Sequence, residues 1–246
     1  MRPLKSSRWL LSGLPLLASL YITQVQAAIV ISGTRVIYSS DQKEVSVKLD
    51  NGGQAPLLVQ SWVDDGDKRS TPDTSTAPFI LTPPIARVNA GQGQTLRIRL
   101  TAQQMLPQDK ESLFWLNVLE VPPSAEDGQN KLNIVFRNRI KLFYRPVGLK
   151  EDMEQAAGKM QWRLKKNVGG WALEGANATP YFLTWSTIKV GDASADLNLE
   201  NSMFAPGEHK TLPLKGAYSP SGSSRIEGGV INDYGGISKL EFPILF

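Results

Sequence analysis

Short runs rich in Val, Ile, Leu and Thr recur along the chain between turn-forming residues, and this pattern restricts the fold more than any other feature. In the first half the expected strands are residues 29–38, 44–49, 57–63, 79–81, 95–100, 113–121 and 132–144. Residues that tolerate positive φ, as at Asn51-Gly52-Gly53, separate the runs. No sustained helical period competes, except a weak turn at residues 101–105. About seven short strands in roughly 120 residues are typical of an immunoglobulin-like sandwich.

The same pattern returns after a break near Pro146 and Gly148, which favour a bend, and a polar stretch that ends at Gly158. The strands expected in the second half are residues 160–164, 171–174, 181–190, 210–214 and 238–245. We therefore predict an all-β chain with an immunoglobulin-like domain over residues 28–147 and a second, smaller β-sandwich over residues 148–246. The two domains are expected to stand at an angle, with a cleft between them.

The N-terminus has the pattern of an export signal. Basic residues precede a short apolar stretch at residues 9–22, and Val25-Gln26-Ala27 fits the small-x-small rule for cleavage. The apolar stretch is shorter than the about 20 residues that a membrane helix needs, and it contains Pro15. We therefore expect residues 1–27 to be a signal peptide and Ala28 to begin a mature chain that does not insert into a membrane.

Composition excludes several kinds of site. The chain has no cysteine, so neither a disulfide nor a thiolate is available in the oxidising compartment that export implies. Its formal net charge is +4. Loss of Arg2, Lys5 and Arg8 with the signal peptide removes three positive charges, 4 minus 3, and leaves about +1. A mature chain so close to neutrality gives no reason to expect nucleic acid as a partner.

The residues that would support catalysis or metal binding are not found in the sequence. His209 is the single histidine, and we interpret it as a surface residue. Asp64-Asp65-Gly66-Asp67 resembles the start of a calcium loop but lacks the later glutamate, so we interpret it as a solvated turn. No Gly-x-Ser-x-Gly motif marks a serine nucleophile. We therefore predict a protein that is not an enzyme and that uses no metal or cofactor.

Residues 131–146 form an unusually long strand-type run, KLNIVFRNRIKLFYRP. The run is about three times the usual strand length of roughly 5 to 6 residues and could extend about 50 Å. Apolar side chains dominate one face, and basic side chains dominate the other. A strand that exceeds the needs of its own sandwich can offer an edge to another chain. The alternative is that its apolar face only packs in the core of its own domain.

Five sequence blocks, taken in their order along the chain, resemble the PapD-like periplasmic chaperones of chaperone–usher pili. The blocks are residues 33–38 (GTRVIY), 79–84 (FILTPP), 111–117 (ESLFWLN), 140–146 (IKLFYRP) and 231–236 (INDYGG). The resemblance covers the whole expected mature chain. It implies a periplasmic chaperone that binds, stabilises and caps pilus or fimbrial subunits (pilins) by donor-strand complementation, and that delivers them to an outer-membrane usher.

Donor-strand complementation means that the chaperone lends a strand that the incomplete sandwich of the subunit lacks. The family pattern implies that Leu132, Ile134 and Phe136 are the donated side chains, spaced two apart so that they share one face. It also implies that Arg35 and Lys141 bind the C-terminal carboxylate of the subunit. Without the resemblance, both cations would be interpreted as ordinary surface charges.

The proposed donors and the proposed anchor differ in parity along the strand. In a regular strand, even-numbered Phe136 and odd-numbered Lys141 point to opposite faces. If both served the same groove, a β-bulge or a twist would have to lie between them, and the expected place is near Asn138.

Three further residues match charged positions at the domain junction of the family. Glu111, Arg145 and Asp233 are therefore expected to form an interdomain structural network. Two carboxylates beside one arginine could also be an acid–base pair, but no substrate pocket is recognisable. The short connection at residues 124–130 resembles the short-loop branch of the family. An unoccupied donor edge can also pair with a second copy of the chain, which allows a self-capping homodimer.

Two other functions compete with this one. A structural pilus subunit or adhesin-like protein would also consist of immunoglobulin-like domains. It would carry an N-terminal donor extension, however, whereas the expected mature chain begins close to the strand that contains Arg35. A carbohydrate-binding module is motivated by the six tryptophans. Trp62 and Trp115 lie inside apolar strand runs, and we interpret them as core residues.

Overall fold

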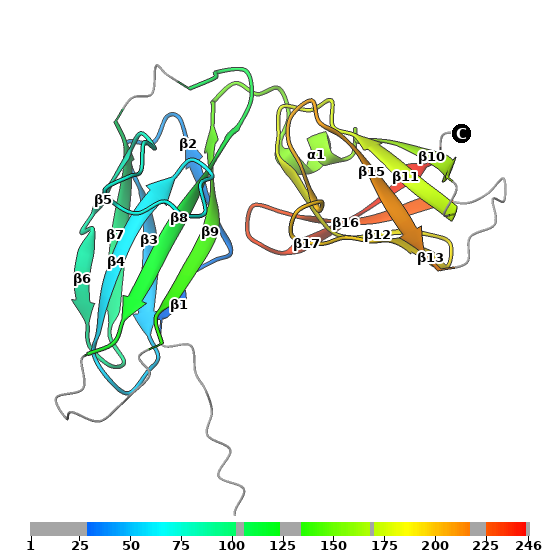
Figure 1. Cartoon of the computed structure of the whole chain (residues 1–246). Helices are drawn as coiled ribbons and strands as arrows, with labels where there is room; N and C mark the ends of the chain where they lie inside the picture. The colour runs from blue at the N-terminus through cyan, green and yellow to red at the C-terminus, as the bar shows by residue number, and fades with distance from the viewer. Residues whose placement is uncertain (1–28, 102–105, 124–133, 168–169, 217–224, 245–246) are drawn as a thin grey trace, which may run out of the picture.

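The protein forms two β domains that follow each other along the chain, as the computed structural model shows (Figure 1). The structure describes residues 29–101, 106–123, 134–167, 170–216 and 225–244. The predicted signal peptide, the connection at residues 124–130, most of the weak turn at residues 101–105 and Leu132 therefore lie outside the described residues. No described helix is long and apolar enough to cross a membrane.

The N-terminal domain is a sandwich of two sheets. One sheet has the order β1-β3-β7-β5, with β1 at Ile29–Ile31, β3 at Val45–Asn51, β7 at Gly93–Leu100 and β5 at Phe79–Thr82. The other has the order β2-β9-β8-β4-β6, with β2 at Arg35–Ser39, β9 at Phe136–Arg145, β8 at Ser112–Val121, β4 at Leu57–Asp64 and β6 at Ile85–Val88. Along β7, Leu96 and Ile98 face the core while Arg97 faces solvent, because side chains alternate along a strand.

The predicted strand at residues 29–38 is two strands that belong to different sheets. β1 pairs with β3, whereas β2 pairs in parallel with β9 in the other sheet. Gly33 lies between them with a φ of 102°, a conformation that favours glycine. The prediction of one continuous strand is therefore wrong, because the segment changes sheets at this glycine.

The C-terminal domain is a curled sheet with the order β10-β11-β15-β13-β12-β16-β17, and β14 pairs with β12 beside this path. Its strands are β10 (Gln161–Asn167), β11 (Gly170–Ala176), β12 (Leu183–Val190), β13 (Ala193–Ala195), β14 (Met203–Phe204), β15 (His209–Lys215), β16 (Arg225–Ile231) and β17 (Ile237–Pro243). Trp162 of β10 and Trp185 of β12 pack edge to face across the core, with ring centres 5.5 Å apart. The sheet therefore folds over so that its two halves enclose one core.

A short helix that the sequence did not predict, α1 (Met153–Ala157), follows the linker between the domains. The carboxylate of Asp152 caps it by accepting a hydrogen bond from the Gln155 amide at 2.8 Å. The buried side of the helix, including Met153, joins the core of the C-terminal domain. The helix is shorter than two turns, so it leaves no periodic apolar pattern in the sequence.

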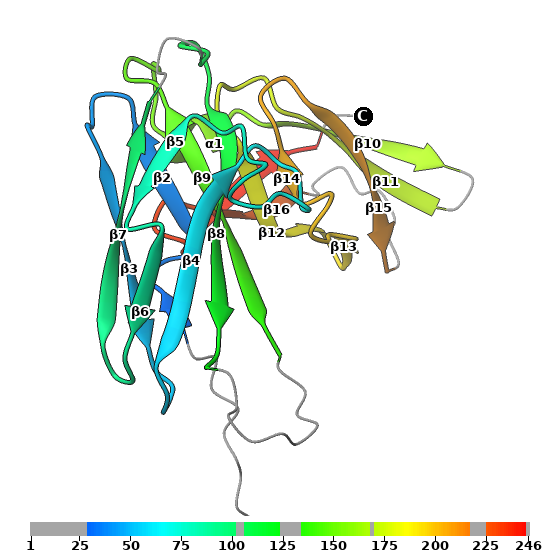
Figure 2. The same cartoon turned by 60° about the vertical axis from the view of Figure 1, so that its left-hand side comes forward.

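The predicted all-β fold with two sandwich-like domains is confirmed, and the domains stand at an angle to each other (Figures 1 and 2). The chain passes from one domain to the other directly after β9. Because β9 ends in the linker, residues near its C-terminal end can contact both domains.

Candidate functional site

β9 is shorter than the sequence predicts. The expected donor strand covers residues 131–146, whereas β9 covers Phe136–Arg145 and has the same length as its neighbour β8. Ile134 and Val135 precede it as exposed residues outside any strand. The apolar beginning of the run therefore has no strand partner in the part of the chain that the structure describes.

β9 pairs with β8 in one uninterrupted antiparallel register, from Glu120↔Phe136 to Ser112↔Tyr144. The bulge expected near Asn138 is absent from this ladder, so that prediction is wrong. A regular register fixes the side chains of even-numbered and odd-numbered residues on opposite faces of the sheet. Phe136 and Lys141 therefore lie on opposite faces of the sheet.

One edge of β9 is only partly covered. β2 pairs with this edge in parallel, from Arg35↔Lys141 to Ser39↔Arg145. Residues 136–140 of the same edge have no strand partner among the described residues. Uncovered backbone donors and acceptors of this kind are a template for a strand from another chain. We call residues 136–140 the open edge; it lies in line with β2 and ends where β2 begins.

The even-numbered side chains of β9 form one row that leads from the core to the outside. Leu142 and Tyr144 are fully buried. At the other end of the row Phe136 is 57% exposed, and Ile134 just before the strand is 58% exposed. Two of the three proposed donors therefore lie outside the core of their own domain, and the third, Leu132, is not among the described residues.

Arg35 and Lys141 lie side by side at the end of the open edge, because the parallel register pairs them. Both side chains reach the C-terminal domain. Arg35 Nη1 donates to the Ile231 carbonyl at 2.9 Å, and Lys141 Nζ donates to Thr184 Oγ1 at 3.1 Å. The structure thus brings the two proposed anchor residues together at the junction of the domains.

Neither of these two cations has an ion-pair partner among the described residues, and the buried Arg35 Nε has no hydrogen-bond partner there. Burial, the charge of Arg35 and the charge of Lys210 together lower the pKa of Lys141 to about 8. Burial also lowers the pKa of Arg35, against the opposing fields of Asp233 and Glu111. Both charged forms are less favourable than in water, so an anion bound between them would be strongly stabilised.

Arg145, Glu111 and Asp233 form a cluster of the opposite kind, in which two carboxylates share one cation. Arg145 Nε donates to Glu111 at 2.7 Å, and its terminal nitrogens donate to Asp233 at 2.6 and 2.7 Å. Glu111 also accepts a hydrogen bond from the Phe182 amide at 2.8 Å, so the cluster links the two domains. Burial raises the pKa of Glu111 despite the nearby Arg145. Burial alone would lower the pKa of Arg145, but its two carboxylates raise it.

Sequence reasoning places Asp64 in a solvated turn, and the structure shows that this is wrong. Asp64 ends β4, is completely buried, and accepts a hydrogen bond from Arg139 Nε at 3.0 Å. Asn117 donates to the same carboxylate at 2.7 Å. Burial alone would raise the pKa of Asp64, but these hydrogen bonds and the Arg139 charge lower it. Arg139, on the basic face of β9, therefore pairs with a buried carboxylate, Asp64, that could not be identified from the sequence.

Trp62 and Trp115 both pack against arginines of β9. Trp62 is buried, as interpreted from the sequence, whereas Trp115 is only partly buried, so the interpretation as a core residue is wrong for Trp115. The guanidinium of Arg137 lies 4.6 Å from the centre of a Trp62 ring, and that of Arg139 lies 4.3 Å from the centre of a Trp115 ring. The sequence alone indicates that Arg137 and Arg139 share one face of the strand, because they are two positions apart. The tryptophans beneath them come from β4 and β8, and only the register between the strands places them there.

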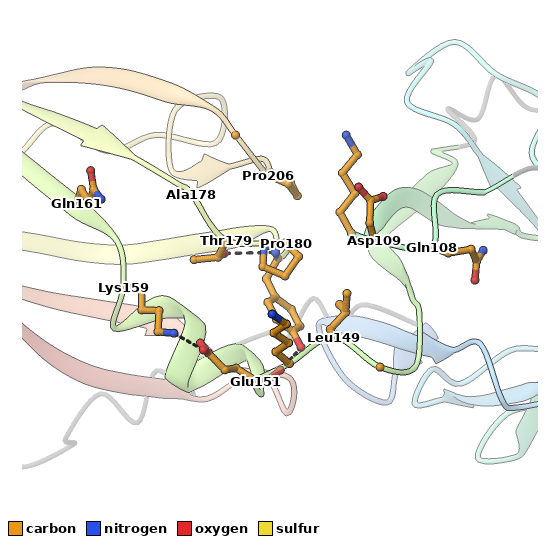
Figure 3. Close-up of a pocket in the computed structure, with 15 residues that line it drawn as sticks. Gln108, Asp109, Leu149, Glu151, Lys159, Gln161, Ala178, Thr179, Pro180 and Pro206 are labelled. Atoms are coloured by element: carbon orange, nitrogen blue, oxygen red, sulfur yellow. Dashed lines mark hydrogen bonds and ion pairs between the residues drawn. The ribbon is translucent and has the colours of Figure 1, made fainter.

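A cleft with a volume of about 780 Å³ lies between the domains, beside the linker (Figure 3). Residues of both domains line it, among them Gln108, Asp109 and Leu149. The Tyr181 hydroxyl donates to the Glu151 carbonyl at its wall. None of the proposed donor or anchor residues lines the cleft, and the described residues contain no group of side chains suited to a metal ion. The cleft is therefore separate from the open edge.

Two family models match the chain. Residues 28–150 match the model "Pili and flagellar-assembly chaperone, PapD N-terminal domain". Residues 155–242 match the model "Pili assembly chaperone PapD, C-terminal domain". The matches correspond to the two observed domains, and the gap between them, residues 151–154, covers the end of the linker and the beginning of α1.

Individual chaperones match over most of their length. The chain is 43% identical over 214 residues to the probable fimbrial chaperone YadV of Escherichia coli (strain K12), covering 85% of this chain and 87% of YadV. It is 43% identical over 237 residues to chaperone protein FimB/FhaD of Bordetella pertussis, covering 94% of each. The crystal structure of YadV matches with a TM-score of 0.73 and 41% identity, covering 87% of this chain and 98% of that chain. A chain of the Salmonella enterica SafA pilin in complex with the SafB chaperone matches with a TM-score of 0.73 and 31% identity, covering 87% and 95%.

Proposed function

Because the chain belongs to the PapD-like family of pilus-assembly chaperones, we propose that it acts in the periplasm, where it stabilises and caps pilus subunits by donor-strand complementation. The members of this family are fimbrial chaperones and not enzymes. This chain is therefore also a chaperone and not an enzyme. The solved complex of the SafA pilin with the SafB chaperone supports a pilin as the partner. The export pattern at residues 1–27 supports the periplasm as the compartment.

The observation that carries this proposal is an open strand edge that ends at Arg35 and Lys141, two cations that have no ion-pair partner among the described residues. β2 occupies the edge of β9 in parallel from Lys141 onward. An incoming strand whose carboxylate reaches Arg35 and Lys141 would lie in line with β2. Its C-terminus would then meet the beginning of β2, so the incoming strand would run parallel to β9 along residues 136–140.

A C-terminal carboxylate fits the cation pair. Its charge relieves the repulsion between Arg35 and Lys141, and a guanidinium and an ammonium group can both donate to its oxygens. A main chain has only one such group, at its end. Recognition of this carboxylate would therefore set the register, because a single residue of the subunit can lie beside Arg35.

The apolar row of β9 supplies the contacts to the subunit core. Phe136 and Ile134 are exposed and two positions apart, and Leu132 is the next residue of the same parity. Burial of each side chain is worth about 1.5–3 kcal/mol before the cost of ordering the strands. A subunit that lacks a strand exposes an apolar groove and two unpaired strand edges, which together favour aggregation. The lent strand would fill the apolar groove and pair with the two strand edges.

The angle between the domains matters because the anchor uses groups from both. Arg35 and Lys141 belong to the N-terminal domain, whereas the Ile231 carbonyl and the Thr184 hydroxyl that orient them belong to the C-terminal domain. The role proposed for Glu111, Arg145 and Asp233 is to hold this angle. Delivery to the usher would then need no nucleotide, because a subunit can complete its fold by exchanging the lent strand for one from the next subunit.

Rescue of the subunit from proteolysis tests the anchor. The tagged chain is used to isolate the pilin that copurifies with it, and intact pilin is then measured on co-expression. Arg35→Ala and Lys141→Ala are each expected to lower the amount of intact pilin about tenfold or more, the equivalent of a lost charge-assisted contact. The matched controls Arg163→Ala and Lys189→Ala remove exposed cations of the C-terminal domain and should leave rescue unchanged. Normal rescue by both anchor variants would contradict the anchor role.

Family membership sets aside the alternatives of a structural subunit, an adhesin-like protein and a carbohydrate-binding module. The self-capping homodimer stays a prediction that follows from the same open edge. Phe136→Asp should shift such a dimer to a monomer in analytical ultracentrifugation. The assignment to the short-loop branch also stays a prediction, because residues 124–130 lie outside the described part of the chain.

A further inference from the structure

Glu120 is a buried carboxylate with no cation beside it among the described residues. It lies near the end of β8, on the core side of the sheet, and is 4% exposed. Its Oε2 accepts a hydrogen bond from the Ile29 amide at 3.3 Å, and its Oε1 accepts one from the Asn138 side chain at 2.9 Å. Both donors are neutral. Buried carboxylates are normally paired with a positive charge, because removing a lone charge from water is costly.

Burial raises the pKa of Glu120, and the hydrogen bonds from Ile29 and Asn138 offset only part of that shift. In the uncleaved chain the carboxylate is therefore unfavourable in its charged form. A cation that arrives next to Ile29 would reverse this balance.

Removal of the predicted signal peptide creates such a cation. Cleavage after Ala27 turns the amide nitrogen of Ala28 into an α-ammonium group. This nitrogen is three bonds from the Ile29 nitrogen, so covalent geometry keeps the two within about 3.6 Å of each other. The Ile29 nitrogen lies 3.3 Å from Glu120 Oε2. In a chain that begins at Ala28, the new charge must therefore lie within about 7 Å of the carboxylate.

We propose that Glu120 is the binding site for the α-ammonium group of the mature chain, so that signal-peptide removal completes an ion pair at the base of the N-terminal domain. The match to the family's N-terminal domain begins at residue 28, which agrees with a mature chain that starts there. Before cleavage the same nitrogen is a neutral amide and Glu120 has no such partner.

The position of Glu120 connects this ion pair to the open edge of β9. Glu120 is directly opposite Phe136 in the ladder, and it holds the Asn138 side chain. Its carboxylate also accepts a hydrogen bond from the amide of Ile29, the first residue of β1. The ion pair therefore acts as a positioning contact for the beginning of β9. The N-terminal domain should gain stability, and the open edge should gain order, only after cleavage.

A double-mutant cycle tests the pairing. The chain that begins at Ala28 is compared with the same chain extended by Gly-Gly-Ser, which replaces the ammonium at Ala28 with a neutral amide. The extension is expected to lower the equilibrium constant for folding in urea about tenfold in the wild-type chain and less than about twofold in Glu120→Gln. An equal effect in both backgrounds, or no effect in either, would overturn the proposal. So would a mature chain that mass spectrometry shows to begin elsewhere than Ala28.

Lys131, which lies outside the described residues, is the control for a competing cation. Lys131→Met is combined with both versions of residue 120. Coupling of Glu120 to Lys131 instead of to the N-terminus would overturn the proposal. If Glu120→Gln does not fold, titration of the α-amino group by NMR decides: its pKa should exceed the usual value of about 7.7 to 8.0, and a value within that range would refute the pairing.

Hydrogen exchange gives a readout at the donor strand. The amides of residues 136–140 should exchange faster in the extended chain than in the chain that begins at Ala28, and equal rates would contradict the positioning role. All these measurements use the chaperone alone. Their failure would leave the proposed capture of subunits untouched, and a failure of subunit rescue would leave the ion pair untouched.

Discussion

Two cationic clusters at the domain junction differ in their balance of charge. Arg145 is shared between Glu111 and Asp233, with three hydrogen bonds of 2.6 to 2.7 Å. Arg35 and Lys141 lie next to each other with neutral oxygens as their hydrogen-bond acceptors. Both clusters bridge the domains, and burial disfavours the charged form of the cations in both.

This difference in charge balance gives the two clusters different roles: the Arg145 cluster stabilises the fold, and the pair of Arg35 and Lys141 is suited to bind an anion. A buried cation that already has its anions contributes to the stability of the protein itself. A buried cation without an anion is a cost to the free protein, and a bound anion removes that cost. Substitutions in the two clusters should therefore change stability in opposite directions, and only one cluster should respond to a ligand.

The largest expected effect is in the balanced cluster. Arg145→Met should destabilise the protein by about 3 kcal/mol, because it leaves Glu111 buried without its cation. The free energy of unfolding in urea measures this. Arg225→Met is the matched control: its partner Glu241 is exposed, so its loss should cost less than about 1 kcal/mol. Equal losses for the two variants would show that Arg145 has no special structural role.

The unbalanced cluster should respond with the opposite sign. Lys141→Met is expected to stabilise the free protein by about 1–2 kcal/mol at pH 7, after allowance for screening of a partly exposed group. The folded pKa of Lys141 is about 8, below the about 10.4 of an unfolded lysine. The folded state thus binds fewer protons, and the free energy of unfolding of the wild type should rise as pH increases from 8 toward 10.

The advantage of Lys141→Met over the wild type should therefore shrink over the same pH range. Urea titrations at several pH values measure the difference. A variant that is less stable than the wild type at pH 7, with no change of the difference up to pH 10, would remove the contrast between the clusters.

Binding of a subunit should change the protonation of Lys141. A subunit carboxylate favours the charged form of Lys141, so binding takes up protons at a pH near the free pKa of about 8. The affinity of a peptide with the subunit's C-terminal sequence is expected to fall about tenfold between pH 7 and pH 9. Calorimetry in buffers of different ionisation enthalpy measures the uptake. Lys141→Met should bind more weakly and without this pH dependence, and an unchanged dependence in that variant would assign the proton to another group.

The fold could be predicted from the sequence because its main signal is local. Side chains that alternate between core and solvent identify strands such as β7 without knowledge of their partners. The change of sheet at Gly33 could not be predicted in this way. It depends on which distant strands, β3 and β9, receive the residues on either side. The beginning of β9 is set in the same way, by how far β8 extends beside it.

The site was harder to predict than the fold, because charge balance is a tertiary property. The chain has 27 Lys and Arg residues, and only the family resemblance selected Arg35 and Lys141 from them. Asp64 illustrates the converse error. Its neighbours in sequence are typical of a solvated turn, but Arg139, 75 positions away, covers its carboxylate. Partners that distant cannot be inferred from the residues around an acid.

The smallest expected effect concerns the single hydroxyl that supports Lys141. Thr184 is buried, and its Oγ1 is 3.1 Å from Lys141 Nζ. Thr184→Val keeps the shape but removes this acceptor, so the charged form of Lys141 loses a hydrogen bond worth about 0.5–1.5 kcal/mol. The pKa of Lys141 should then fall below about 8, as NMR of its labelled side chain can follow.

Ser186→Ala is the control for Thr184→Val, because the Ser186 hydroxyl donates to Gly229 and not to the cation pair. It should leave the pKa of Lys141 unchanged. If Thr184→Val also left it unchanged, the ammonium group would not depend on the C-terminal domain for its orientation. Arg35 would then be the stronger link between the anchor and that domain, through its hydrogen bond to the Ile231 carbonyl.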